Sequence, residues 1–479
     1  MKGRTQLIFL LAGITAILLL FALAEHRPGL FANTTILGAI LALQIAFFGL
    51  SHFETAFFPL LIGTFLWAGS ALPFHGTAMS LRWLFLAIGA LGGFLIWIKK
   101  RPHTRHFGSF HLVALFCVAS AIVTAMVSDK PKPALLKVLS LFLLFLYASS
   151  GARIAIAGRE KKFVTSLVLA SEVLVYLSAV CYIALHFSVF GNPNALGAVV
   201  GVVAVPILLW AAATAETRGL RQRRFFALLL CGGLLYISNS RASILGAATV
   251  ILLFAIAMRQ QRRLLQCAFV CVFLVTVMAV VDPSHLNELA SSVTGKVLYK
   301  ERGTVHGVFA SRVSPWSETL SVVKRHPWFG SGFGTSDLGD LRPDSASSSV
   351  YTKEGTNREH GNSYLALAEY SGILGAVPFL VLLLMLLRTL AHVYRWMRKT
   401  GSPFHYCIPF ALVASAGLVH AFFEDWLFAV GSYLCVFFWV AAFVLIDLVP
   451  VREPRSSTIL FQPSPRIMAV SSNCIFADK

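Results

Sequence analysis

Long apolar runs separated by short polar connections follow one another along almost the whole chain. A helix needs roughly 20 apolar residues to cross a bilayer, and most of these runs approach that length. Backbone groups in lipid are satisfied only inside helices or closed barrels, so the runs are interpreted as helices. We place fourteen spans at 6–24, 34–50, 54–72, 81–98, 108–127, 133–150, 163–187, 194–214, 225–240, 242–258, 264–281, 364–387, 405–421 and 427–448. Several are short or closely joined, so the pattern predicts an all-α polytopic membrane protein with about 12–14 transmembrane helices.

This pattern divides the chain into four segments. Helices 1–11 occupy residues 1–281, a polar loop covers 282–362, helices 12–14 cover 363–448, and a tail rich in Pro, Ser and charge covers 449–479. Such a composition predicts disorder for the tail. Ala22-Leu23-Ala24 resembles a signal-peptidase site, but the apolar run before it is long for a signal peptide, so we expect an uncleaved first helix.

The positions of the basic residues predict the orientation. Only 13% of the residues are charged, yet the net charge is +19. Nineteen basic residues fall in alternate connections, at 99–105, 153–162, 218–224, 259–263 and 388–399. The short connections on the other side hold Arg27, Arg82, Lys130 and Lys132. Because basic loops stay in the cytoplasm, the loop 282–362 is expected on the outer face and the tail inside. Topology thus accounts for the charge, and no nucleic-acid partner is expected.

The outer loop is the one long hydrophilic segment between spans, and its 81 residues carry nine basic and nine acidic side chains. Trp316, Leu320 and Val323 recur at helical spacing and predict a helix that ends before His326-Pro327. The sequence GSGFG at 330–334 predicts a tight turn, and a helical pattern resumes at 362–365. Long connections of this kind are usually folded or functional.

Several classes of chemistry lack their sequence motifs here. The chain has no GxxxxGK[ST] phosphate loop, no DxD pair and no zinc-binding spacing. Seven of the eight cysteines lie inside apolar runs, none forms CxxC, and they are interpreted as small hydrophobic side chains. We therefore expect no metal and no cofactor. An enzyme on the outer face has no ATP supply, so its substrate must already be activated.

Three polar motifs are expected to meet at the outer face. They are SNSRAS at 238–243, SRVSPW at 311–316 with HPWFGSGFG at 326–334, and EHGNSYL at 359–365 with EYSGILG at 369–375. Together with GNPN at 191–194, their order over roughly 190–440 resembles the O-antigen ligase and polymerase family of bacterial inner-membrane proteins.

The resemblance implies a metal-independent glycosyltransferase that moves a glycan from undecaprenyl pyrophosphate to an acceptor glycan or glycolipid at the periplasmic face. By motif match, Arg241 and Arg312 correspond to arginines proposed to bind the pyrophosphate, and His360 to a loop histidine proposed as general base. Many members read His-Asn at that place, whereas Gly361 separates His360 from Asn362 here. The supporting or acceptor-binding candidates are Asn362, Tyr364, Glu359 and His326.

The residue types suit this chemistry on their own terms. A guanidinium group binds phosphate oxygens through two parallel bonds and stays charged, so two arginines can neutralise a departing pyrophosphate. A histidine with a pKa near ~6.5 can accept a hydroxyl proton at neutral pH. The surrounding spans can hold the polyprenyl chain in the membrane.

Each candidate also has a structural interpretation. Arg241 can snorkel at a helix end, Arg312 can pair with Glu318 or Asp337, and His360 can be a surface histidine. His326, before a proline, is expected to shape a turn rather than to act as a base. The turn residues Glu424 and Asp425 are expected to be solvated, with acceptor binding as the alternative.

Three functions remain open at this point. A ligase moves a finished glycan to its acceptor, a polymerase extends a lipid-linked chain, and a flippase or other transporter moves the lipid-linked glycan across the bilayer. Transporters place ionisable groups near the bilayer midplane, where only Glu172 plainly lies, with Ser166 or Lys137 as its expected partner. The polar motifs gather instead around one outer loop, so we favour the enzyme, and the ligase first.

Overall fold

The computed structural model describes residues 44–72, 75–100, 107–262, 310–336 and 360–450, with scattered residues between 265 and 277. The first predicted span, nearly all of the eleventh, most of the outer loop, Glu359 and the tail after residue 450 lie outside the described residues. The division of the chain into four segments stays a prediction.

Every regular element in the described part of the chain is helical, as the apolar runs predicted. Six helices are long and apolar enough to cross a membrane, or up to seven if the bent pair Gln44–Ser51 and Phe53–Ala68 forms one span. Three shorter apolar helices accompany them. The all-α polytopic fold is thereby confirmed. The bounds are α3 Phe58–Ala68, α4 His75–Lys100, α5 Ser109–Val127, α6 Pro131–Ser149, α7 Gly151–Ile156, α8 Glu160–Ala184, α9 Pro193–Ala198, α10 Val205–Ala213, α11 Arg218–Ser238, α12 Arg241–Ala257, α15 Ala310–Arg325, α16 Ser363–Thr400, α17 Cys407–His420 and α18 Tyr433–Leu448, with π-helical η2 Phe53–Phe57 and η3 Val199–Ala204.

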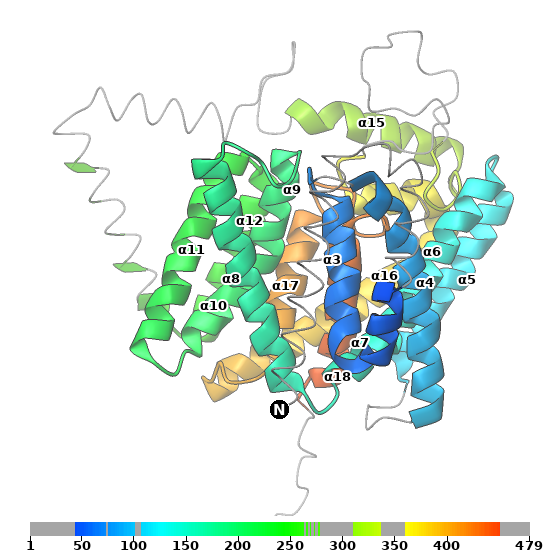
Figure 1. Cartoon of the computed structure of the whole chain (residues 1–479). Helices are drawn as coiled ribbons and strands as arrows, with labels where there is room; N and C mark the ends of the chain where they lie inside the picture. Colours follow the sequence, from blue (N-terminus) through cyan, green and yellow to red (C-terminus); the bar gives the residue numbers. More distant parts are fainter. Residues whose placement is uncertain are drawn as a thin grey trace, which may run out of the picture.

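The helices form one bundle with α15 lying across one of its ends (Figure 1). On one side α11 packs against α8, α9 and α10, and on the other side α4 packs against α3 and α6. The helices α16, α17 and α18 join the two sides, because α16 contacts α5, α17 contacts α12, and α18 contacts α6.

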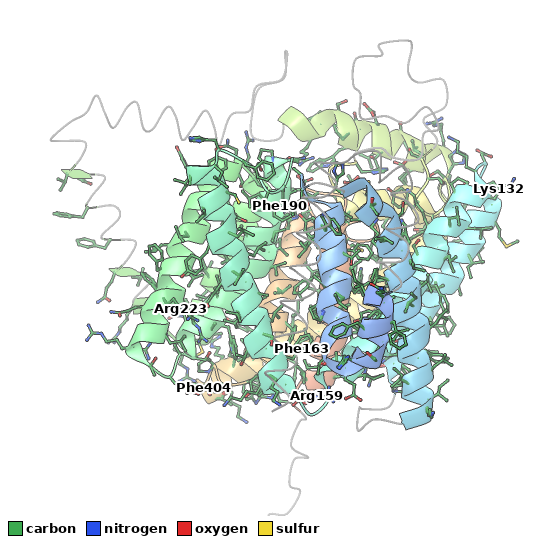
Figure 2. All side chains as sticks on the ribbon, in the orientation of Figure 1. Lys132, Arg159, Phe163, Phe190, Arg223 and Phe404 are labelled. Carbon is green, nitrogen blue, oxygen red and sulfur yellow. The ribbon has the colours of Figure 1, made fainter. Side chains whose placement is uncertain are left out.

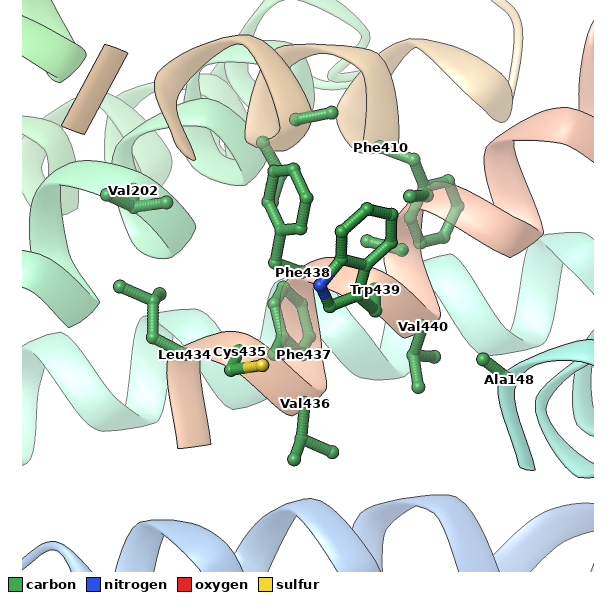
Figure 3. Packing of buried hydrophobic residues seen from close by; sticks show 14 of the residues in the cluster. Ala148, Val202, Phe410, Leu434, Cys435, Val436, Phe437, Phe438, Trp439 and Val440 are labelled. Atoms are coloured by element: carbon green, nitrogen blue, oxygen red, sulfur yellow. The ribbon is translucent and has the colours of Figure 1, made fainter. Parts of the chain in front are cut away.

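The centre of the bundle is built around α18. Its residues from Tyr433 to Leu445 are all buried, so the helix is apolar on every side and fits only where other helices surround it. Trp439 is fully buried, and its indole N–H donates to the carbonyl of Leu427 at 2.7 Å. Figure 3 shows Phe437, Phe438 and Trp439 among neighbouring helices. This packing fixes the connection 421–432 between α17 and α18, which carries Glu424 and Asp425 among mostly apolar residues.

The two ends of the bundle carry the residues that the charge pattern assigned to opposite sides. Arg159, Arg223 and Phe404 lie at the end away from α15, whereas Lys132 lies near the α15 end (Figure 2). The first three belong to connections expected inside, and Lys132 to one expected outside. We therefore name the end at α15 the outer end.

Candidate active site

The first predicted arginine stands at the start of a helix on the outer end. Asn239 adopts a left-handed conformation (φ +50°) that ends α11, and Arg241 is the first residue of α12. Its side chain is partly buried. The N-terminus of a helix carries a partial positive charge, which adds to that of the guanidinium. SNSRAS thus joins two helices, α11 and α12, at this end of the bundle.

The second arginine comes from the first turn of α15, which confirms the predicted helix around Trp316. Arg312 Nη2 lies 2.5 Å from Glu424 Oε1, in the connection between α17 and α18. Of the two partners expected for Arg312, Glu318 accepts a bond from the Ser314 hydroxyl at 2.9 Å, and Asp337 lies outside the described residues. Arg312 and Arg241 lie close enough for their like charges to interact. The two arginines therefore lie within range of each other's charge.

Gly361 makes room for Arg312. Its φ is +63°, and a Cβ atom at this position would lie 2.9 Å from Nη1 and 3.0 Å from Cδ of Arg312. The Gly361 carbonyl also accepts a bond from the Trp316 indole at 3.1 Å. The glycine between His360 and Asn362 thus has a local reason: a side chain there would displace the guanidinium.

His360 is enclosed by carboxylates rather than exposed on the loop. Only 1% of its surface is accessible. Its Nδ1 lies 3.0 Å from Asp425 Oδ2, which also accepts the His360 backbone N–H at 2.8 Å. Its Nε2 lies 3.4 Å from Glu369 Oε1, and the Tyr370 ring packs edge-on against the imidazole at 5.0 Å between centroids. The alternative of a surface histidine is therefore wrong.

These neighbours set the charge state of the pair. Burial by itself lowers the pKa of His360, but the bond to Asp425 and the Glu369 carboxylate outweigh it and raise that pKa above 6.5. Burial raises the pKa of Asp425, whereas the bonds from His360 outweigh it and lower that pKa below 3.8. Both shifts favour an imidazolium beside an ionised carboxylate.

Three consecutive residues of the connection 421–432 hold three parts of the site. Glu424 binds Arg312, Asp425 binds His360, and Trp426 donates its indole N–H to His420 Nδ1 at 2.7 Å. The side chains of Glu424 and Asp425 are 21% and 23% exposed. Both are therefore partly exposed, as expected of turn residues, but each also pairs with a site residue from another segment.

The Trp426 contact continues as a chain of hydrogen bonds to the Arg241 turn. Indole N–H is only a donor, so His420 Nδ1 must accept, and His420 Nε2 is left to donate to Ser243 Oγ at 3.1 Å. Ser243 Oγ lies 2.7 Å from Ser240 Oγ, next to Arg241. His420, Ser243 and Ser240 are all buried. No pattern in the sequence pointed to His420, which lies in an apolar run far from the motifs.

A broken helix supplies the remaining carboxylate. Within α16, Gly372 has φ +62°, and the predicted turn at 330–334 packs into the break. Ile373 N–H donates to the Pro327 carbonyl at 2.8 Å, Leu374 N–H to Trp328 at 3.1 Å, and Ser331 N–H to the Glu369 carbonyl at 2.8 Å. The segment 327–331, which leads into the turn, thus satisfies backbone groups that the break frees, as burial requires. It also fixes Glu369 beside His360.

The turn is held from its other side by α5 and α6. Ser128 Oγ donates to the Ser331 carbonyl and Lys137 Nζ to the Gly334 carbonyl, each at 2.7 Å. Lys137 also interacts electrostatically with Asp425. The expected pairing of Glu172 with Ser166 or Lys137 is wrong: Glu172 lies 2.7 Å from Arg223 and 3.8 Å from Arg224. The pairing was not predicted because both arginines belong to α11, which is distant from Glu172 in the sequence.

The other predicted site residues have local structural contacts. Asn362 caps α16 by accepting the N–H groups of Tyr364 at 2.8 Å and Leu365 at 3.1 Å. The Tyr364 hydroxyl donates to the Leu418 carbonyl at 2.8 Å. His326 follows α15, and its carbonyl accepts the Gly330 N–H at 3.1 Å, as expected of a turn residue. Glu359 lies outside the described residues.

No group of three or more His, Cys, Asp or Glu side chains among the described residues could hold a metal ion. Of the cysteines in this part of the chain, Cys117, Cys231, Cys407 and Cys435 are buried and Cys181 is partly buried. They are free thiols, which agrees with their interpretation as small hydrophobic side chains.

Comparison with known proteins identifies one domain. The O-antigen ligase family model matches residues 226–380, which include Arg241, Arg312 and His360. The match confirms the resemblance indicated by the motifs, over a shorter range than 190–440. The connection 421–432 lies beyond the matched residues. No curated protein matches the sequence.

Proposed function

We propose, from the match of residues 226–380 to the O-antigen ligase family model, that the protein transfers a glycan from undecaprenyl pyrophosphate to an acceptor sugar. The reaction takes place at the periplasmic face of the bacterial inner membrane, with the finished glycan passing to a glycan or glycolipid acceptor. A polymerase that extends the lipid-linked chain is the alternative within the same class.

The convergence of Arg241 and Arg312 carries the proposal. Two guanidinium groups from separate helices lie close enough to repel each other, at the start of α12. A pyrophosphate between them would replace this repulsion with charge-assisted hydrogen bonds. The lipid pyrophosphate that departs in the reaction is negatively charged, and the two guanidinium groups would stabilise that charge. Because the helix N-terminus also favours an anion, the same place suits the donor before and after cleavage.

A transporter of the lipid-linked glycan is the candidate of another class. Its strongest support in the sequence was the midplane carboxylate Glu172. That carboxylate forms an ion pair with Arg223 and lies near Arg224, so its contacts give it a role in packing α8 against α11. The buried polar side chains His360, Glu369 and Ser243 lie in the network at the outer end instead.

Purified protein in lipid nanodiscs tests the proposal. With lipid-pyrophosphate glycan and a glycolipid acceptor, we expect transfer that continues in the presence of a metal chelator. Loss of transfer with the chelator would contradict a metal-independent mechanism.

A deletion strain distinguishes the three functions. Accumulated lipid-linked polymer identifies a ligase, and accumulated single repeat units identify a polymerase. Unprocessed glycan retained on the inner leaflet would indicate the transporter.

A further inference from the structure

The geometry of His360 leaves no nitrogen for an incoming hydroxyl group. The ring is 1% exposed, and its two nitrogens face the carboxylates of Asp425 at 3.0 Å and Glu369 at 3.4 Å. The Nδ1 contact fits a proton on Nδ1, and Nε2, which has no hydrogen-bond partner among the described residues, faces the Glu369 carboxylate, so protonation of both nitrogens is favoured. An imidazolium has no lone pair with which to accept a proton. In this arrangement the histidine orients its neighbours.

Asp425 is the accessible member of the pair. Its side chain is 23% exposed. Oδ2 accepts both the backbone N–H and the Nδ1–H of His360, at 2.8 Å and 3.0 Å. No hydrogen bond joins Oδ1 to another residue in the described part of the chain. One carboxylate oxygen is thus fixed by His360, and the exposed part of the side chain leaves the carboxylate within reach of a hydroxyl group.

The neighbours of Asp425 in the chain place it beside the pyrophosphate-binding arginines. Glu424 binds Arg312 directly, and Trp426 connects through His420 and Ser243 to the first turn of α12. The Ser363 hydroxyl fixes this segment from both sides, because it donates to the Glu424 carbonyl at 2.6 Å and accepts the Leu427 N–H at 3.1 Å. A displacement of Asp425 relative to the arginines would break these contacts.

We propose that Asp425 accepts the proton of the acceptor hydroxyl, and that His360 is a positioning residue which holds its carboxylate. This inference rests on the proposed glycosyl transfer. The hydroxyl oxygen forms a bond to the anomeric carbon of the donor while the bond from that carbon to the pyrophosphate oxygen breaks. The lipid pyrophosphate leaves with the electron pair of the broken bond, and Oδ1 of Asp425 takes the hydroxyl proton. Release of that proton to water restores the carboxylate.

The pH dependence separates the two bases. Asp425 is faced by His360, by Lys137 of α6, by Glu369 and Tyr370 of α16 through His360, and by the Glu424–Arg312 pair. Its lowered pKa leaves it ionised down to acidic pH, so the turnover number should show no acid limb between about pH 5.5 and 7. A histidine base whose pKa is raised above 6.5 would instead lose activity throughout that range.

Substitution of the two residues gives the decisive comparison. General-base catalysis contributes about 10²–10⁴-fold, so D425N should lower the turnover number by that factor while binding of the lipid-linked donor remains. D425E should recover part of the rate, and formate should stimulate D425A because a small carboxylate can occupy the vacated position. H360Q, which keeps one donor toward Asp425, should lose less activity than D425N. Asp129, an exposed carboxylate at the outer α5–α6 turn, provides the matched control D129N, which should remain fully active.

Three outcomes would overturn the assignment. They are wild-type turnover by D425N, an acid limb near or above pH 6.5 that disappears in H360Q, or stimulation of H360A by imidazole with no effect of formate on D425A. Donor binding and elution as a monodisperse particle show that each variant is folded. If the wild-type protein transfers no glycan at all, the proposed function fails instead, and the two failures are thereby distinguished.

Discussion

Replacing Gly361 with alanine should displace Arg312 without removing any polar group from the site. Two effects act together at this position. An L-residue in the left-handed region costs about 1–2 kcal/mol, and Gly361 has φ +63°. In addition, the new Cβ would approach Nη1 of Arg312 to 2.9 Å and Cδ to 3.0 Å, so the side chain must move. The guanidinium then shifts relative to Glu424, which it now meets at 2.5 Å.

The expected result is a loss of kcat/KM for the donor in addition to the loss of stability. Misplacement of a binding group by about 1 Å can cost roughly 10²-fold, so a shift of a few tenths of an ångström should lower kcat/KM by about tenfold. That factor corresponds to about 1.4 kcal/mol of lost transition-state stabilisation. Glycosyl transfer at varied donor concentration measures it, and thermal denaturation in detergent measures the stability.

Gly401 offers a control with the same backbone cost. It ends α16 at φ +65°, and no heavy atom lies within 4 Å of a Cβ placed there. G401A should therefore lose a similar amount of stability and retain wild-type kcat/KM. The idea that Gly361 serves to position Arg312 would be refuted if G361A had the wild-type kcat/KM. It would also be refuted if G361A and G401A lost kcat/KM by the same factor.

Three further results are expected. R312K should lose at least tenfold in kcat/KM although the charge is kept, because an ammonium cannot form two parallel bonds to phosphate; near-normal transfer by R312K would indicate a simple charge role. W426F should lower the free energy of unfolding by about 1–3 kcal/mol, because it leaves the buried His420 Nδ1 without its donor, and should raise the KM for the donor; an unchanged KM would separate the hydrogen-bond chain from Arg241. In a topology assay, a cysteine at Ser347 should be labelled from the periplasmic side and one at Thr400 from the cytoplasmic side, and the reverse pattern would invalidate the placement of the site.

The class of fold and the location of many of its elements follow from local sequence. Spans 81–98, 108–127 and 163–187 lie within or close to the observed helices α4, α5 and α8. The helix before His326 and the restart at Ser363 were also predicted. These features depend on properties that a short window contains: a bilayer requires long apolar helices, and a polar residue such as Asn362 caps the helix that follows it.

The resemblance to the O-antigen ligase family singled out Arg241, Arg312 and His360, and their residue types suit phosphate binding and proton transfer. It could not show what surrounds them. Glu424 lies 112 residues from Arg312, and Asp425 lies 65 residues from His360. A turn between two apolar runs resembles any solvated turn until α15 and the residues just before α16 contact it.

The charge of the site residues and their access to substrate are established only when the chain is folded. Folding encloses His360 between two carboxylates, leaves Asp425 partly accessible, and joins Trp426 through His420 to the helix of Arg241. The physical reason is that burial and pairing, rather than residue type, set the charge of a titratable group and its access to substrate. Residue types in the motifs therefore limit which side chains could do the chemistry, and the packing of distant segments selects the one that faces the substrate.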